Sequence, residues 1–330
     1  MPDLSTSYAG LTLRSPIIIG SSDLTDSVRK IQQLEESGAG AVVLGSIFEE
    51  EIALEHESVM AGLRAQGRDL IDYDSYEYHI RAQHLDSVTQ LIRDAKKSVS
   101  IPVIASINCV YSHEWTTFAK FLEDAGADAL ELNMFFLPSD MSRDSKETEN
   151  LYFEVIRRVR QEISIPIIVK MSYYFSSLLQ LIRRICDSGV AGVVMFNRFY
   201  SPDFDIDKME IMSSKVLSSP EEFPISLRWV ALSYGRISCE IAASTGIHDS
   251  TAMIKQFLAG AQVVQVVSAL YMHRRGYVRT MLDELETWMD RKGFGCLDDF
   301  RGKLSQAESK DPALFERVQF MKFFQGPGRG

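Results

Sequence analysis

The sequence has few cysteines: 4 in 330 residues, with no CxxC pair among them. So few thiols in so long a chain do not form the disulfide framework of a small secreted domain or the ligand set of a zinc site. We therefore expect reduced cysteines and no metal centre. The N-terminus has an acid at Asp3 and no apolar core of a signal peptide, which predicts a cytoplasmic protein.

The chain also lacks an excess of positive charge and any long apolar run. Lys and Arg number 35 against 45 Asp and Glu, so the formal net charge is −10. A negative field repels phosphate backbones and anionic lipids, and no segment approaches the roughly 20 apolar residues that span a bilayer. Nucleic acid and membranes are therefore not expected as partners, and a tRNA-reducing role is disfavoured. A small-molecule substrate is expected instead.

What the chain does contain is a repeated phrase in which a small residue and glycine precede a β-branched run. Counting related runs gives eight short apolar segments, and none alternates cleanly between apolar and polar residues. Runs that are apolar on both faces are typical of a buried parallel sheet. The eight runs are residues 15–22, 37–46, 101–108, 125–134, 165–172, 188–198, 239–245 and 259–269.

Segments with helical periodicity lie between these runs and end at glycines, where a left-handed C-cap is favoured. The stops are Gly38, Gly126, Gly189 and Gly260, and Ser112 is the predicted N-cap of the second of these helices. Alternating strands and helices form either a closed barrel or an open doubly wound sheet. The recurrence of one phrase along the chain, without GxGxxG after the first strand, predicts an α/β fold of the (β/α)8 TIM barrel type.

The expected organisation is one barrel domain over residues 1–310 and a C-terminal helical tail with a mobile end over 311–330. Residues 4–15 alternate around Gly10 and are predicted to form an N-terminal hairpin that plugs the barrel. Long inserts are expected after strand 2 (47–84) and strand 6 (199–238), because both exceed an ordinary loop. Both leave from the face where barrel enzymes place their active sites, so lids or subunit contacts are expected there.

Polar side chains stand at the C-terminal ends of otherwise apolar strands. Asn108, Asn133 and Asn197 end the third, fourth and sixth runs, and an amide offers donors and acceptors to the edge of a heteroaromatic ring. Lys170 lies inside the fifth run. It could form a barrel ion pair with Glu131, neutralise an anionic cofactor, or act as a Schiff-base nucleophile.

Small residues at two further strand ends predict a phosphate site. Thr245 and Gly246 follow the seventh strand, and Ser268 follows the eighth. Backbone amides of these two loops form the usual phosphate cradle of such barrels. Arg198 and Arg228 could bind a substrate carboxylate through two parallel hydrogen bonds, or Arg228 could stack on Trp229.

With these residues in place, the chain resembles the dihydroorotate dehydrogenase family of FMN-dependent barrels over roughly residues 4–308, and more closely its dihydroorotate dehydrogenase-like branch. The ELN, VK, final Asn and (S/T)G elements stand at successive strand ends, and their combination is specific to this family. The phrases that carry the resemblance are ALELNMFFLP (129–138), IPIIVKMSYYF (165–175), VVMFNRFY (193–200), ISLRWVALSYGR (225–236), AASTGIHD (242–249) and AGAQVVQVVSALY (259–271).

The resemblance implies an FMN cofactor at the barrel mouth, with Lys170 beside the ring as its electrostatic partner. It also implies that Asn133 and Asn197 contact the substrate, and Arg198 is added as a substrate candidate. A homodimer is expected on the same ground. The residues expected to bind the cofactor are Gly20, Ser21, Ser22, Ser46, Asn108, Asn133, Lys170, Ser244, Thr245, Gly246, Val267 and Ser268.

The sequence departs from the family where the substrate binds. Phe136 occupies the position of the family's catalytic Cys or Ser, Pro138 that of a substrate asparagine, and Gly45 that of a lysine near the flavin. The substrate loop is not recognisable within 47–84. The general base is therefore unassigned. Candidates near the mouth, for each of which a packing or rim role is the more ordinary one, are Cys109, His113, Tyr173, Tyr174, Tyr200 and His248.

These observations predict an FMN-dependent oxidoreductase of the dihydroorotate dehydrogenase type that acts on a CH–CH bond of a small, pyrimidine-like molecule in pyrimidine metabolism. Two alternatives stay open. One is a flavin-binding protein without turnover, consistent with the loss of the base at Phe136. The other is a phosphosugar aldolase-like barrel in which Lys170 forms an imine.

Overall fold

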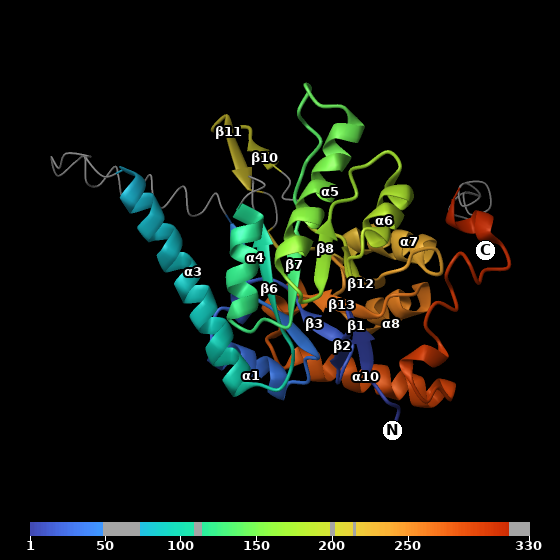
Figure 1. The fold of residues 1–330 in the computed structure, drawn as a ribbon. Coiled ribbons are helices and arrows are strands. Elements are labelled where there is room, and N and C mark those ends of the chain that lie inside the picture. The colour runs from blue at the N-terminus through green and yellow to red at the C-terminus, as the bar shows by residue number, and fades with distance from the viewer. Residues whose placement is uncertain (49–72, 109–113, 199–201, 214–215, 317–330) are drawn as a thin grey trace.

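The computed structural model describes residues 1–48, 73–108, 114–198, 202–213 and 216–316. Within them, eight parallel strands close a barrel, because β4 pairs with both β3 and β6 and so joins the two ends of the sheet (Figure 1). The predicted TIM barrel is confirmed, with one strand in each predicted run. The strands are β3 (Ile17–Ile19), β4 (Ala41–Val43), β6 (Val103–Asn108), β7 (Ala129–Asn133), β8 (Ile167–Met171), β9 (Gly192–Met195), β12 (Glu240–Ser244) and β13 (Val263–Val266).

Helices surround this barrel and bury their apolar faces against it (Figure 1). The four glycines predicted to end helices all have positive φ, from +88° at Gly189 to +122° at Gly260, which is the conformation that glycine adopts at least cost. Ser112, the predicted N-cap, lies outside the described residues. The helices are α1 (Val28–Glu36), α3 (Tyr73–Ser98), α4 (Glu114–Asp124), α5 (Ser145–Glu162), α6 (Leu178–Asp187), α7 (Phe223–Ser233), α8 (Ser250–Ala259), α9 (Ser268–His273) and α10 (Tyr277–Lys292).

The N-terminal hairpin of β1 (Thr6–Tyr8) and β2 (Leu11–Leu13) plugs the barrel, as predicted. Tyr8 is fully buried and its hydroxyl donates to the carbonyl oxygen of Val193 at 3.3 Å. The plug packs in one apolar layer with a side chain from every barrel strand. Gly192 makes room for it, since a Cβ there would lie 2.9 Å from the Tyr8 ring. The plug therefore fills the barrel at this end.

Both predicted inserts contain regular structure. Helix α3 begins at Tyr73, so the insert after the second strand ends earlier than the predicted residue 84; its residues 49–72 lie outside the described part. The insert after the sixth strand contains the hairpin of β10 (Pro202–Asp205) and β11 (Glu210–Ser213), the 3-10 turn η2 (Pro220–Glu222) and α7. Phe204 and Ile211 pair on one face of the hairpin and are exposed. The exposure of these two side chains does not by itself show a subunit contact, so the expected homodimer stays a prediction.

Two cysteines depart from the expectation. Cys186, at the end of α6, and Cys239, just before β12, form a disulfide with their Cα atoms 5.2 Å apart. The expectation that all cysteines are reduced is therefore wrong for this pair, although one cross-link is not a framework. In the C-terminal tail, η4 (Pro312–Phe315) is described and the rest of the predicted helical stretch is not, so the domain boundary at residue 310 stays a prediction. None of the described helices combines the length and the apolar character needed to cross a membrane.

Candidate active site

A cavity of about 540 Å³ opens at the C-terminal ends of the barrel strands. Its size is in the range of sites that hold small molecules and cofactors. Eight of the twelve residues predicted to bind a cofactor line it together with both Asn197 and Arg198, and the remaining four are Gly20, Ser46, Asn108 and Asn133. The predicted residues on its wall are Ser21, Ser22, Lys170, Ser244, Thr245, Gly246, Val267 and Ser268, with Gly20 just beneath Val267.

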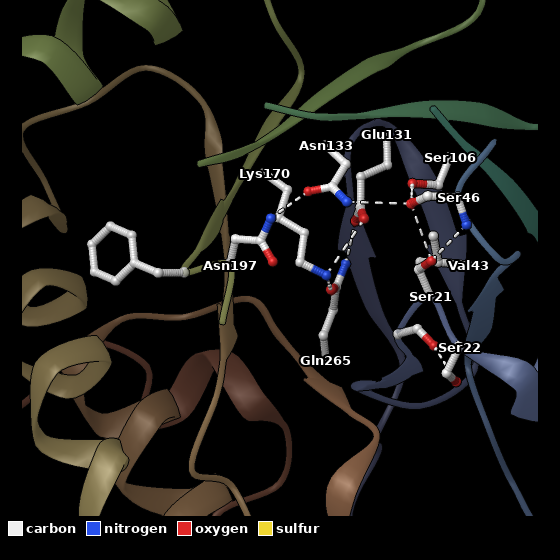
Figure 2. Close-up of polar contacts among 12 residues, drawn as sticks. Ser21, Ser22, Val43, Ser46, Ser106, Glu131, Asn133, Lys170, Asn197 and Gln265 are labelled. Atoms are coloured by element: carbon white, nitrogen blue, oxygen red, sulfur yellow. Dashed lines mark hydrogen bonds and ion pairs between the residues drawn. The ribbon is translucent and has the colours of Figure 1, made fainter. Parts of the chain in front are cut away.

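A continuous chain of polar side chains crosses the barrel mouth (Figure 2). The hydroxyl of Ser46 lies 3.2 Å from that of Ser21 and 2.7 Å from that of Ser106. The side-chain amide of Asn133 donates to the same Ser46 oxygen at 3.3 Å, and the Asn197 amide donates to Asn133 Oδ1. Five strand ends are therefore linked, which fixes the orientation of both asparagine amides.

A second polar group lies deeper in the barrel, around Lys170. Its ammonium donates to Gln265 Oε1 at 3.1 Å and is 3.6 Å from Glu131 Oε1 (Figure 2). Gln265 completes the triangle by donating to Glu131 Oε2 at 2.6 Å. Glu131 is fully buried and Lys170 is 9% exposed, toward the cavity. The predicted ion pair thus exists, and Gln265 holds both of its members.

The loops after β12 and β13 form a tight cradle at one end of the cavity. Gly246 has φ +76°, and a Cβ there would lie 2.4 Å from the backbone nitrogen of Phe223. Thr245 also has positive φ, and its hydroxyl donates to the carbonyl oxygen of Phe196 at 3.1 Å. A side chain in place of Gly20 would collide with Val267, 2.9 Å away. These positions leave backbone amides and hydroxyls at the surface of the cradle.

Residue Ser218 closes this end of the cavity from the insert side. Its backbone N–H donates to Ser268 Oγ at 2.9 Å, and its hydroxyl lies 3.1 Å from His248 Nε2. Burial lowers the pKa of His248 more than the hydrogen bond to Ser218 raises it. The imidazole is therefore neutral at pH 7, and it tethers a loop rather than adding charge to the cradle.

A family model described as dihydroorotate dehydrogenase matches residues 3–289. The chain belongs to the dihydroorotate dehydrogenase family. A dihydroorotate dehydrogenase B (NAD(+)) catalytic subunit of Thermoplasma volcanium is 24% identical over 92% of this chain and 98% of the relative. One from Methanocaldococcus jannaschii is 23% identical over 87% and 93%. The chloroplastic dihydropyrimidine dehydrogenase (NADP(+)) of Arabidopsis thaliana is 23% identical over 96% and 80%.

Membership in this family confirms the resemblance on which the oxidoreductase prediction rests. It leaves the aldolase alternative without support. An imine at Lys170 would also remove the contacts of its ammonium with Glu131 and Gln265. An aldolase function gives no reason for these contacts.

Phe136, which the sequence predicts to stand at the position of the family's catalytic Cys or Ser, packs among aromatic side chains. Its ring packs edge-to-face on Tyr152, with the centroids 5.5 Å apart, and Tyr152 in turn packs on Phe175. The Tyr152 hydroxyl donates to the carbonyl oxygen of Met134 at 3.1 Å. Position 136 therefore belongs to an aromatic cluster after β7, and a hydrocarbon ring there cannot accept a proton.

The other candidates for the base fall into two groups. Cys109, His113 and Tyr200 lie outside the described residues. Tyr173 packs on Phe196, and burial, together with its hydrogen bond to the hydroxyl of Tyr174, raises its pKa to about 12. A phenol with that pKa keeps its proton at neutral pH, so Tyr173 is not a base.

The two arginine candidates differ in position. Arg198 lines the cavity, but its Nε lies 3.1 Å from Glu222 Oε2 and its Nη1 donates to the carbonyl oxygen of Val216 at 2.7 Å. Arg228 is exposed on α7 and is not among the described residues that line the cavity. Asn108 is buried at the end of β6, opposite Phe48.

Sequence reasoning missed several residues of the site, among them Ser106, Ser218, Glu222 and Gln265. Ser106 and Gln265 are polar residues inside apolar strand runs, which is the same signal that identified Lys170. Glu222 had no such signal, because it reaches the site from the insert.

Proposed function

We propose that this protein is an FMN-dependent oxidoreductase that acts on a CH–CH bond of a small, pyrimidine-like molecule. The observation that carries the proposal is the joint placement of Lys170, Asn197 and the small-residue cradle around one cavity of a family barrel, with Asn133 hydrogen-bonded to Asn197. FMN, when bound, would accept or supply the hydride equivalent. The chain's own residues would bind, orient and exclude water.

The cavity suits this cofactor at both ends. Gly246 and Gly20 keep side chains off the backbone at places where a Cβ would lie within 3 Å of a neighbour, and they support the cradle that we assign to the phosphate. The hydroxyl of Ser268 and the backbone amides of Thr245 and Gly246 are suitable donors. We assign the flat ring to the space above Ser21 and Ser22, next to Lys170.

The role that we assign to Lys170 is electrostatic. Gln265 and Glu131 hold its ammonium at a fixed place on the cavity wall. A fixed cation stabilises negative charge that develops beside it without having to reorganise during the reaction. This role accounts for the presence of a charged residue inside a barrel strand.

The polar chain through Ser46 is the proposed substrate platform. It presents the amides of Asn133 and Asn197 in fixed orientations, which suits a ring with carbonyl and N–H groups. Phe136 removes the family's base from this platform. That one observation favours a second candidate, a flavin-binding protein without turnover.

The test is an absorption spectrum of the purified protein, followed by anaerobic addition of dihydropyrimidines. We expect a yellow protein that releases FMN on denaturation and is bleached by a substrate. Yellow protein that no dihydropyrimidine bleaches would favour binding without turnover. Colourless protein that takes up no added FMN would refute the proposal.

A matched variant tests the position of the lost base. Phe136→Cys restores a group that can accept a proton, and Phe136→Val is the control that changes size without adding one. We expect dihydroorotate-dependent bleaching to rise only in the Cys variant. Equal bleaching in the two variants would show that position 136 does not contribute the base.

A further inference from the structure

We infer that the substrate is an uncharged cyclic amide or imide, of the uracil type, and not a ring that carries a carboxylate. This inference rests on the proposed function and adds the charge class of the substrate to it. It is drawn from how the charged side chains at the cavity are already paired, together with the hydrogen-bonding groups that the asparagine pair leaves available.

Three of the described residues that line the cavity carry charge: Asp23, Lys170 and Arg198. Each of the two cations has a carboxylate partner, Glu131 for Lys170 and Glu222 for Arg198. Asp23 adds a further negative charge to the wall. The described side-chain charges around the cavity therefore total −1, and the cofactor phosphate that we assign to the backbone amides of the cradle would add to it, so a substrate carboxylate would enter a region that is already negative.

Arg198 is held by its present partners and is not poised for a ligand. Its Nε lies 3.1 and 3.3 Å from the two carboxylate oxygens of Glu222, and its Nη1 donates to Val216. Glu222 is fixed in turn, because its Oε1 accepts the backbone N–H of Ser219 at 2.8 Å. A substrate carboxylate could recruit Arg198 only by breaking this arrangement and leaving Glu222 without its cation.

Lys170 is committed in the same way. Its ammonium is shared between Gln265 Oε1 and Glu131 Oε1, and Glu131 is fully buried. Moving the ammonium toward a substrate anion would leave a buried carboxylate unpaired, which is among the most unfavourable changes inside a protein. Neither described cation is therefore available to compensate a carboxylate.

The asparagine pair offers what a neutral amide ring needs. Asn197 donates one N–H to Asn133 Oδ1, and Asn133 donates one N–H to Ser46 Oγ. This leaves the second N–H of each amide and the Oδ1 of Asn197. Two donors and one acceptor match the C=O and N–H groups of a cyclic amide or imide.

Uracil and orotate are the matched probes, because they differ only by the carboxylate. Flavin content is measured first; binding of each pyrimidine is then followed by the change in the flavin spectrum and by calorimetry at pH 7. We expect uracil to bind at least tenfold more tightly than orotate. Orotate binding as tight as uracil binding, or binding of neither to yellow protein, would overturn this inference alone. Colourless protein that takes up no FMN would overturn the proposed function as well.

Gly45 provides a gain-of-function test. It is exposed beside Ser46, and a Cβ built there meets no heavy atom of the described residues within 4 Å, so they leave room for a longer side chain. Gly45→Lys adds a cation with no carboxylate partner at the platform, and Gly45→Gln is the neutral control of similar length. We expect the Lys variant to bind orotate at least fivefold more tightly than wild type, with uracil affinity unchanged, and the Gln variant to change neither. A Lys variant that gains nothing for orotate would contradict the charge argument.

Discussion

Replacing Lys170 by Met should destabilise the folded protein far more than replacing a surface lysine of a shorter ion pair. The methylene stem of Lys170 is replaced by a chain of similar volume, so the main loss is the cation itself. Glu131, which is fully buried, then keeps a charge with only Gln265 as a hydrogen-bond partner among the described residues. Breaking a buried pair in this way costs about 3–5 kcal/mol.

The corresponding change in melting temperature follows from the size of the chain. At about 2.1 cal/mol/K per residue, 330 residues have an unfolding entropy of about 0.7 kcal/mol/K near the midpoint. A loss of about 3–5 kcal/mol therefore lowers Tm by about 4–7 °C. Circular dichroism at one scan rate measures it, with the flavin occupancy of wild type and variant made equal so that cofactor loss does not contribute.

Lys96→Met is the matched control. Lys96 is 2.7 Å from Asp128, closer than Lys170 is to Glu131. Both members of this surface pair are partly exposed, since the side chain of Lys96 is 33% accessible and that of Asp128 is 26% accessible. Surface pairs contribute about 0–1 kcal/mol, which corresponds to about 1 °C here. The comparison separates the effect of burial from that of distance.

The double variant Glu131→Gln/Lys170→Met removes both charges. It should recover more than half of the Tm lost in Lys170→Met, because no unpaired ion remains. A single variant that melts within 1 °C of wild type, or a double variant less stable than the single one, would refute the reasoning about the buried pair.

Three further expectations follow from the structure. Gly246→Ala should lower Tm and flavin retention together, since its φ is +76° and the added Cβ meets backbone at 2.4 Å; unchanged retention would contradict our cradle. Burial would raise the pKa of Glu123, but hydrogen bonds from the hydroxyl and N–H of Ser164 outweigh it and lower the pKa to about 2. This stabilisation is complete above the unfolded pKa of about 4.5 and is lost as pH falls toward 2, so melting curves from pH 6 to 3 should decline less steeply in Glu123→Gln. Thiol titration of unreduced, denatured protein should give two free thiols rather than four, because Cys186 and Cys239 are joined; four would exclude the cross-link.

Much of the fold could be predicted from the sequence because its signals are local. Each apolar run had to be a strand buried on both faces, and glycines such as Gly189 and Gly260 ended the intervening helices through their own conformational preference. Repetition of that unit implied closure of the barrel. The hairpin plug was predicted from alternation around Gly10, with no knowledge of which strands it would contact.

The site was predicted only in part, because its geometry depends on contacts between distant segments. Asn133 and Lys170 could be placed at the mouth from their strands alone. The pairing of Arg198 with Glu222 could not, since it depends on the path of an insert whose described strands do not pair with the barrel strands. The same is true of Cys186 and Cys239: they are 53 residues apart, and only the folded barrel brings the end of α6 close to the residue that precedes β12.

Ser46 has one hydroxyl hydrogen and two neighbouring hydroxyls, those of Ser21 and Ser106, that can accept it. Its oxygen already accepts an N–H from Asn133. A rotation of this single hydrogen exchanges donor and acceptor roles along the serines while every heavy atom stays in place. The serines at the barrel mouth can thus reverse their hydrogen-bonding polarity at the speed of a hydroxyl rotation and without movement of a loop.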